Sequence, residues 1–362
     1  MTNLFDFIDW RGDLSFDQVP PCQVDLLIFS EIIHAPLENL EKGYEGQTLL
    51  SLSSQVYPKA VKGKANSLLP SRYKIWDKMK SLRRFAEVRL ENFTARFEHE
   101  NNRQFAAGLF SLNENTAVVA FRGTDSTITG WKEDLMMGFT SPVPAQSDSL
   151  EYLNSIPAKY TTLYVCGHSK GGNLAMYSSA LCNDQERIKV VYSFDGPGLD
   201  SSVLCTQGWN NILTRTRLII PESSIIGLLM GHISDYTIIT SDSMSIMQHN
   251  PFYWHVLGPQ FVEAQKTTKS SKINDKALHE FLDKCSVEQI RVLVETSFDL
   301  FDAIGAETLG DIPKAAMTHI PQIKKVLSKL NPEDSQLIRE AFRILGSSYG
   351  KFFMEVMKKT AE

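Results

Sequence analysis

Apolar side chains recur with a helical period near the start of the chain. They fall three and four residues apart in residues 21–41 and again in residues 73–86. This spacing is typical of amphipathic helices, so it predicts a helix in each segment. We expect both helices to belong to an N-terminal helical segment, residues 1–86.

From residue 88 the pattern changes to strands that alternate with helices. An Asn-Glu-Asn triplet at residues 113–115 predicts a hairpin turn between two of the strands. The predicted strands are residues 88–98, 104–112, 116–121, 163–166, 189–194, 216–220 and 236–240, and the predicted helices among them are residues 131–138, 149–155 and the run after residue 170. This alternation predicts an α/β fold with a mostly parallel central sheet and helices on both faces. Ligands bind at the carboxyl ends of the strands in such sheets.

The composition changes close to residue 264. Residues 264–274 are rich in Lys, Ser and Thr, which predicts a linker. The linker separates an α/β domain, residues 1–263, from a C-terminal helical region, residues 275–362.

The C-terminal region carries an apolar stripe. Ile290, Val294, Phe298 and Phe301 fall on one face of a helix expected over residues 287–304, and such a face must be buried against something. We favour packing against the α/β domain. A homodimer through these helices and peripheral contact with a membrane remain open.

The sequence Gly-His-Ser-Lys-Gly-Gly-Asn at residues 167–173 carries the clearest chemical signal. A β-prone run precedes its Gly-x-Ser-x-Gly core and a helix-forming run follows it. This context is that of a nucleophile elbow, a strained turn that exposes a serine at the top of a sheet. Glycines at positions 167 and 171 allow the strand and the helix to approach closely. We therefore predict that Ser169 is a nucleophile; an ordinary glycine-rich turn is the alternative.

A second strand, residues 116–121, ends in a turn that contains Thr124. The oxyanion hole of an α/β-hydrolase takes one main-chain amide from the residue after the nucleophile and one from an earlier strand–helix loop. We expect Lys170 and Thr124 to supply these amides. For the side chains, we expect a partly solvated Lys170 and an Arg122 paired with a carboxylate such as Asp134.

The general base must be a histidine that follows the nucleophile and the acid in the chain, because the α/β-hydrolase order is Ser, acid, His. His232, His249 and His255 meet that condition within the α/β domain. His249 lies in a loop after the last predicted strand, where the fold places its base. We therefore favour His249, with His232 and His255 as alternatives.

The acid is less well defined. Asp195 ends the strand after the elbow helix, and there it can accept the Nδ1 hydrogen of the base and fix its tautomer. We favour Asp195, and Glu222, Asp242 and Asp235 stay open. The alternative for Asp195 itself is a turn residue that binds its own backbone amides.

Three motifs together resemble the fungal-type (class three) triacylglycerol lipases: Phe-Arg-Gly-Thr at residues 121–124, Trp-Lys-Glu-Asp at 131–134 and Gly-His-Ser-Lys-Gly-Gly at 167–172. The last of these motifs, extended by Asn173, resembles an uncharacterised bacterial lipase-like family more closely than it resembles the fungal-type lipases. The resemblance covers about residues 3–260 and implies a serine hydrolase fold with His249 as base. It also implies an acid one strand after Asp195, where this chain has Glu222 and no Asp.

The composition of the chain argues against several classes of protein. The 362 residues are 43% hydrophobic and 22% charged, and a net charge of −5 argues against nucleic-acid binding. No apolar run reaches the roughly 18–20 residues that span a bilayer, and no signal peptide is recognisable, so we expect a cytoplasmic protein. The five scattered cysteines are expected to be free thiols. No pattern calls for a metal or a cofactor.

These observations predict a serine hydrolase that cleaves carboxylic esters, of small molecules or lipids, through an acyl-enzyme on Ser169. An amidase, peptidase or thioesterase would use the same residues. A different class also stays open: a catalytically weak or inactive hydrolase scaffold that serves as a binding or regulatory module. The missing Asp at the fungal-lipase position motivates this alternative.

Overall fold

A computed structural model describes residues 2–40, 43–56, 68–98, 100–124, 128–138, 140–224, 226–228, 230, 235–243, 245–264, 286–305, 315 and 318–345. By its internal contacts the chain divides into two units. The first comprises Met1–Thr124 and Pro144–Thr268, and the second comprises Asp125–Val143 and Lys269–Glu362. The predicted linker, residues 264–274, lies outside the described residues except for its first position.

The N-terminal part of the first unit is mainly helical, as predicted. Its elements are α1 (Leu4–Arg11), α2 (Gln23–Ile32), the 3-10 turn η1 (Leu37–Asn39), a short strand β1 (Gln47–Thr48), α3 (Leu49–Val56), α4 (Leu69–Met79) and α5 (Arg83–Ala86). The helix expected over residues 21–41 ends at Ile32, shortly before Pro36, because a proline disfavours helical backbone at the residue before it. The helix expected over residues 73–86 is interrupted at Leu82, whose backbone is extended.

The sheet has eight strands whose spatial order follows the chain. They are β1, β2 (Arg89–Glu98), β3 (Arg103–Ser111), β4 (Thr116–Phe121), β5 (Thr162–His168), β6 (Ile188–Phe194), β7 (Thr216–Pro221) and β8 (Tyr236–Ile239). The first four pair antiparallel, and β4 to β8 are parallel. The predicted α/β class is therefore confirmed. A separate small hairpin joins β9 (Val256–Leu257) and β10 (Gln260–Phe261).

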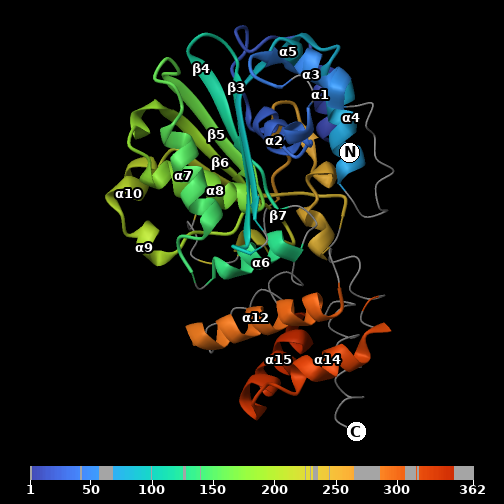
Figure 1. The fold of residues 1–362 in the computed structure, drawn as a ribbon. Coiled ribbons are helices and arrows are strands. Elements are labelled where there is room, and N and C mark those ends of the chain that lie inside the picture. The colour runs from blue at the N-terminus through green and yellow to red at the C-terminus, as the bar shows by residue number, and fades with distance from the viewer. Residues whose placement is uncertain are drawn as a thin grey trace. The chain divides into compact units, whose positions relative to one another are not determined.

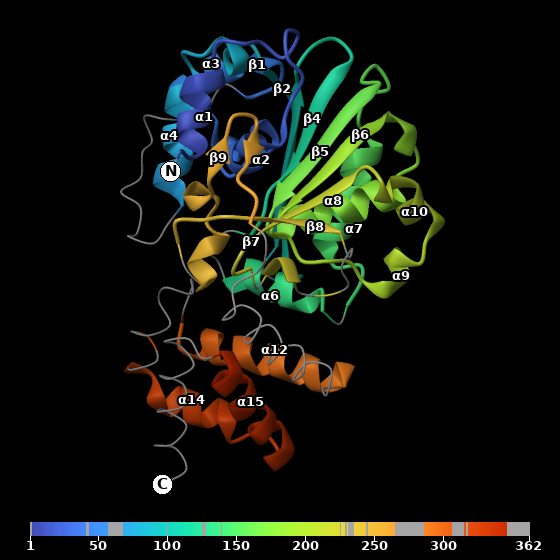
Figure 2. The same ribbon diagram turned by 180° about the vertical axis from the view of Figure 1, so that it is seen from behind.

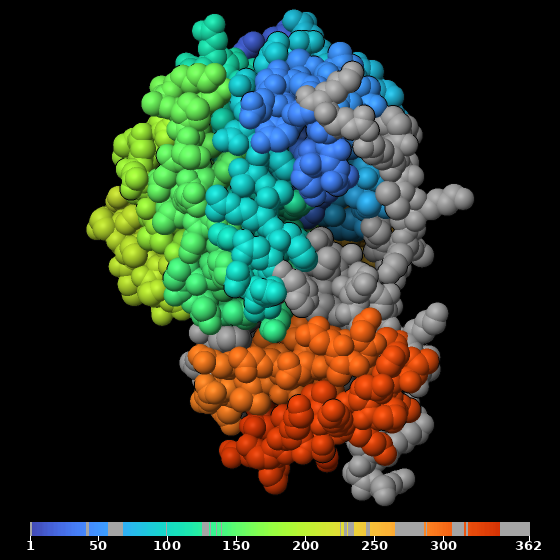
Figure 3. All heavy atoms as spheres, in the orientation of Figure 1, coloured from blue at the N-terminus to red at the C-terminus, as the bar shows by residue number. Residues whose placement is uncertain are grey.

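Helices cover both faces of the sheet (Figures 1 and 2). The crossovers α7 (Pro144–Asn154), α8 (Lys170–Leu181) and α10 (Gln207–Leu213) pack together on one face, beside the short α9 (Ser201–Leu204). Each crossover moves one strand along in the same direction, so right-handed connections place these helices on the same face. The other face is left for α2 and its neighbours. In the space-filling view the N-terminal helices (blue) and the α7–α10 region (green to yellow) lie on different sides of the first unit (Figure 3).

Alternation along the strands fixes which side chain meets which helix. On β3, Phe110 packs against Phe29 of α2 with ring centroids 5.1 Å apart, whereas Phe105 faces Tyr152 of α7 at 6.3 Å. Successive strand residues point to opposite faces, so odd and even positions serve the two layers. β3 and β4 read as nearly continuous apolar runs because both of their faces are buried.

A buried ion pair ties the N-terminal helices together. Arg84 donates from Nε and Nη2 to the two oxygens of Asp25, each at 2.7 Å, and both side chains are fully buried. The same guanidinium donates to the carbonyl oxygens of Leu14 at 2.8 Å and Val19 at 3.2 Å, and it lies 4.1 Å above the ring of Phe16. Every polar group of the pair is thus partnered, which a buried charge requires.

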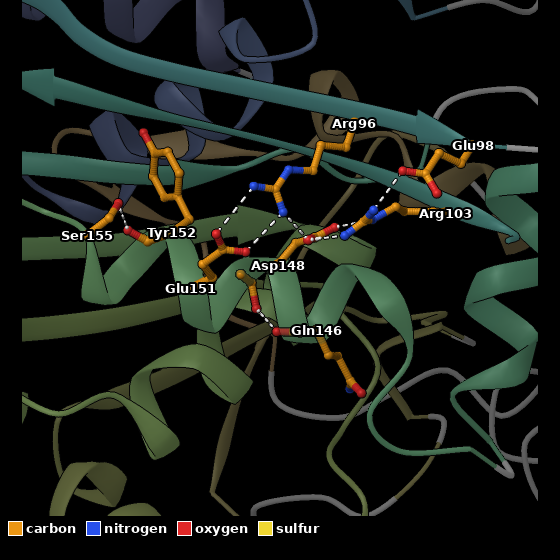
Figure 4. Close-up of polar contacts among 9 residues, drawn as sticks. Arg96, Glu98, Arg103, Gln146, Asp148, Glu151, Tyr152 and Ser155 are labelled. Carbon is orange, nitrogen blue, oxygen red and sulfur yellow. Dashed lines mark hydrogen bonds and ion pairs between the residues drawn. The ribbon is translucent and has the colours of Figure 1, made fainter.

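A second ion-pair network joins the sheet edge to α7 (Figure 4). Arg96 of β2 and Arg103 of β3 both donate to the buried carboxylate of Asp148, at 2.5 and 2.7 Å. Arg96 also reaches Glu151, and Arg103 reaches Glu98. Because the network lies at the rim of the sheet and its outer members are exposed, we assign it a structural role.

The second unit consists of α6 (Ile128–Met136), α12 (Val287–Ala303), α14 (Ile320–Leu327) and α15 (Pro332–Leu345). Val294 and Phe298 of the predicted apolar stripe are buried in a core that also contains Ile323 and Ile338. The stripe is therefore covered, at least in part, by helices of its own unit. The contacts group α6 with these helices, although it lies within the residues that the sequence assigns to the α/β domain. Among the described helices, none has the length and hydropathy that crossing a membrane would require.

The fold predicts a large cost for removing one member of the buried ion pair. Asp25→Ala leaves the Arg84 guanidinium buried without its carboxylate, so we expect the free energy of unfolding to fall by about 3–5 kcal/mol. Asp9→Ala is the control, because Asp9 pairs with Lys78 at 2.6 Å but is 58% exposed, and its removal should cost less than about 1 kcal/mol. Urea unfolding of both variants measures the difference; equal losses would contradict the assignment.

Candidate active site

Ser169 stands at a strained turn between β5 and α8. Its backbone angles are φ 58° and ψ −132°, a left-handed φ that costs energy in any residue other than glycine. β5 ends at His168 and α8 begins at Lys170, so the turn consists of Ser169 alone. A nucleophile elbow needs a strained turn of this kind between a strand and a helix.

Glycines make the turn possible. A Cβ atom placed on Gly167 would lie less than 3.0 Å from main-chain atoms of Gly171, and one on Gly171 would lie equally close to the carbonyl oxygen of Phe121. A Cβ on Gly196 would lie 2.7 Å from the carbonyl oxygen of Ser169. The strand, the helix and two loops thus meet through main-chain atoms, where a side chain has no room.

The loop after β4 lies directly against the elbow. A Cβ on Gly123 would lie 3.3 Å from the Cβ of Ser169 and closer still to the carbonyl oxygen of His168. Thr124, the predicted oxyanion residue, is the next residue in this loop. Lys170 is the first residue of α8, and the first amides of a helix lack intrahelical partners and face its positive end. Both predicted oxyanion residues therefore belong to segments that adjoin Ser169.

Asp195 and His249 are joined by a hydrogen bond. The distance from His249 Nδ1 to Asp195 Oδ2 is 2.7 Å, and Asp195 is buried. The other carboxylate oxygen accepts from the Ser224 hydroxyl and, at 3.1 Å, from the Gly227 amide. Asp195 follows the carboxyl end of β6 and has a φ of 48°. The hydrogen bonds of its carboxylate go to Ser224, Gly227 and His249, which lie outside its own turn, whereas a simple turn residue would bind its own backbone amides.

His249 lies beside the residue that precedes the elbow serine. Its ring is stacked on the ring of His168, with centroids 4.6 Å apart and an interplanar angle of 29°. His168 Nε2 also lies 2.9 Å from the main-chain oxygen of His249. The structure thus brings His249, Asp195 and the elbow together at the carboxyl ends of β5 and β6.

The alternatives for the base and the acid lie elsewhere or outside the described residues. His255 pairs with Asp242 through a 2.6 Å contact between Nε2 and Oδ1, and the pKa of Asp242 is lowered by this hydrogen-bonding partner. Asp235 is exposed. Glu222 forms no ion pair or hydrogen bond with a histidine in the part of the chain that the structure describes, and His232 lies outside that part.

Two side chains inside or next to the motifs brace the site, and the sequence analysis assigned them no role. Asn173 of α8 donates to the carbonyl oxygen of Gly198 at 2.5 Å and so holds the loop after Asp195. Gln248 accepts from the amide of Ser223 at 2.7 Å and donates to the oxygen of Ser243 at 2.8 Å. Both are buried. Their one signal in the sequence is their position inside the elbow motif and next to His249.

The Lys170 side chain is not partly solvated as expected, whereas the Arg122 side chain does pair with a carboxylate. Lys170 is fully buried, and its Nζ donates to the main-chain and side-chain oxygens of Gln104, each at 2.9 Å. The expected partly solvated side chain is therefore wrong, because the start of α8 is covered by β3. Arg122 lies 3.6 Å from the carboxylate of Glu38, which is an ion pair of the expected kind with a different acid.

Neither a metal nor a disulfide is indicated in the described residues. No group of three His, Cys, Asp or Glu side chains is placed there to hold a metal ion. Cys22, Cys166, Cys182 and Cys205 are free thiols, and Cys285 lies outside the described residues. Burial raises the pKa of Cys166 to about 12, so this thiol beside the elbow is not a nucleophile at neutral pH.

Comparison with known families places most of the region that carries the site in a family. The model of a family described as Mbeg1-like matches residues 79–299, more than half of the chain. The matched region includes the elbow, the loop after β4, Asp195 and His249. No curated protein matches the chain.

The close main-chain contact at the elbow predicts an unusually intolerant glycine. Gly171→Ala forces Cβ against the carbonyl oxygen of Phe121, so we expect the free energy of unfolding to fall by about 3 kcal/mol or more. Gly43→Ala is the control, because Gly43 has a φ of +68° with no atom within 4 Å of the new Cβ and should cost about 1–2 kcal/mol. Thermal and urea unfolding would measure both, and a smaller loss at position 171 would contradict the packing described.

Proposed function

The chain belongs to the Mbeg1-like family, which is lipase-like, and we propose that it is a serine hydrolase that cleaves carboxylic esters. The observation that carries the proposal is the 2.7 Å hydrogen bond between Asp195 and His249, made beside a serine with a strained backbone. A buried acid, a histidine and a serine at a sharp turn are the parts of a catalytic triad.

The triad works by proton transfer. Asp195 accepts the Nδ1 hydrogen of His249, which leaves Nε2 as the acceptor for the hydroxyl proton of Ser169. Oγ of Ser169 then attacks the ester carbonyl. The buried carboxylate stabilises the imidazolium that forms, without taking the proton itself.

The negative charge that develops on the carbonyl oxygen needs fixed donors. We assign this role to the amides of Lys170 and Thr124, where the helix end and the loop after β4 adjoin the serine. Such donors, held in advance, stabilise the transition state without reorganisation. His249 then protonates the leaving alcohol and later activates the water that releases the acid from the acyl-enzyme.

The substrate class rests on the lipase-like family. We propose a lipid or other acyl ester, and amides and thioesters remain open because the same residues serve all acyl transfers. The binding-module alternative was motivated by the missing Asp at the fungal-lipase position. A buried Asp195 on His249 weakens that motive, because it supplies an acid from the preceding strand. The cytoplasmic location, the membrane contact and the homodimer stay predictions.

Ser169→Ala should abolish ester hydrolysis while the fold is retained. Loss of a triad member lowers kcat by about 10⁴-fold or more. The measurements are turnover of p-nitrophenyl esters from short to long chain and labelling by a fluorophosphonate probe. Ser179→Ala, a buried serine on the same helix, is the control that should keep both. Turnover at the level of this control in Ser169→Ala would overturn the proposal.

A second pair of variants identifies the acid. Asp195→Asn keeps the shape of the side chain but offers an amide to His249 in place of a carboxylate, so kcat should fall by about 10³- to 10⁴-fold with little change in KM. Glu222→Gln should stay within a few-fold of the parent. If Glu222→Gln proves the more damaging change, the acid stands at the fungal-lipase position.

A further inference from the structure

A second buried acid lies beside the residue that precedes the elbow serine. Glu31 lies on α2, which packs on β5, and its side chain is fully buried. One carboxylate oxygen, Oε2, accepts from Nε of Arg72 at 2.8 Å. The other, Oε1, lies 3.0 Å from Nδ1 of His168 and has no hydrogen-bonding partner besides this contact among the described residues. The triad does not use either residue.

His168 continues this connection to the base. The opposite ring nitrogen, Nε2, lies 2.9 Å from the main-chain oxygen of His249, and the two imidazole rings are stacked. Contacts therefore run without a break from Arg72 through Glu31 and His168 to the main chain of His249. His168 is itself buried, so its ring contacts protein on both sides and is not available to substrate.

The chemistry of the partners fixes where hydrogen must lie. A main-chain carbonyl oxygen can only accept, so Nε2 of His168 must carry the hydrogen of that contact. Burial raises the pKa of Glu31, but the charges of Arg72 and His168 outweigh burial and hold this pKa well below its usual value. Burial also lowers the pKa of His168. Nδ1 and Oε1 lie 3.0 Å apart, and two bare acceptors would repel at that distance, so a hydrogen must lie between them. Glu31 thus orients His168 much as Asp195 orients His249.

We propose that Glu31 and His168 are positioning residues that hold the main chain and ring of His249 in line with Ser169. The inference rests on the proposed function, since it assigns a role relative to the base. His249 is the last residue of a short 3-10 helix, η5 (Ser245–His249), and a reacting group displaced by about 1 Å can lose about 10²-fold in rate. A fixed donor at the main-chain oxygen of His249 and a flat ring beneath its imidazole restrict that displacement.

Two substitutions of His168 separate positioning from stability. The amide nitrogen of glutamine reaches roughly the place of Nε2, and that of asparagine reaches roughly the place of Nδ1. His168→Gln therefore keeps the donor to His249 and leaves Oε1 of Glu31 unpartnered. His168→Asn keeps the partner of Glu31 and loses the donor to His249. A purely structural role makes the Gln variant the worse one in every measurement.

A positioning role for His168 predicts that the two variants rank in opposite orders for stability and for kcat. We expect His168→Gln to have the lower free energy of unfolding, yet to keep kcat within a few-fold of the parent. We expect His168→Asn to be the more stable of the two and to lose about 10- to 100-fold in kcat, with KM little changed. If kcat falls in the same order as stability, or if both variants keep parental kcat, the proposal is wrong.

Glu31→Gln gives a second route if a His168 variant fails to fold. Its amide oxygen can accept from Arg72 and its amide nitrogen can donate to Nδ1 of His168, which leaves Nε2–H directed at His249. We expect kcat within a few-fold of the parent. A loss as large as that expected for His168→Asn would contradict a role based on hydrogen-bond direction.

A readout without catalysis separates failure of this proposal from failure of the proposed function. The Nδ1 proton of His249, in its 2.7 Å hydrogen bond to Asp195, should give a low-field proton NMR signal that is absent from His249→Asn. We expect that signal to be retained in His168→Gln and to be broadened or lost in His168→Asn. If the parent neither hydrolyses esters nor reacts with a fluorophosphonate, the function falls and the NMR signal still decides the positioning. A signal unchanged in both variants would overturn the positioning.

Discussion

The site depends on main-chain atoms that approach each other more closely than a side chain would allow. At the elbow, β5, α8 and the loop after β4 meet where Gly167, Gly171 and Gly123 leave no room for a Cβ. Only this packing lets Ser169 occupy a left-handed backbone conformation, because the surrounding structure compensates for its strain. The segments that carry Thr124 and Lys170 adjoin the serine for the same reason.

The second constraint is the arrangement of buried charge around two histidines. Asp195 follows β6 and Glu31 lies on α2, and each directs one oxygen at a histidine and the other at a separate donor. A buried carboxylate is costly unless all its lone pairs are used. Each imidazole is at once a partner that stabilises a buried acid and the group that this acid orients, so the same contacts serve the stability and the geometry of the site.

Local patterns in the sequence predicted much of this structure. The elbow, the strands from β2 to β8 and the hairpin at residues 113–115 depend on short-range spacing and turn chemistry, and the α/β class follows from their alternation. The choice of Asp195 and His249 followed from chain order and from positions at strand ends. Burial of Lys170 could not be predicted, because Gln104 on another strand covers it. Glu31 likewise could not be predicted, because its partners lie on α4 and β5. The grouping of α6 with the C-terminal helices is another long-range property without a local signal.

The strand order has a consequence for when the chain becomes reactive. The strands β4 to β8 lie side by side in the order in which they are synthesised. Ser169 follows β5, whereas its proposed base His249 is made only after β8. His249 is 81 residues beyond His168. Contacts of such sequence separation form late relative to local ones, and domains fold as units during synthesis. A nascent chain would thus contain the serine motif before its proposed base is made. The proposed hydrolase would therefore be inactive until β8 has joined the sheet and the segment that carries His249 has folded. This order would prevent hydrolysis by the incomplete chain without a separate inhibitory segment.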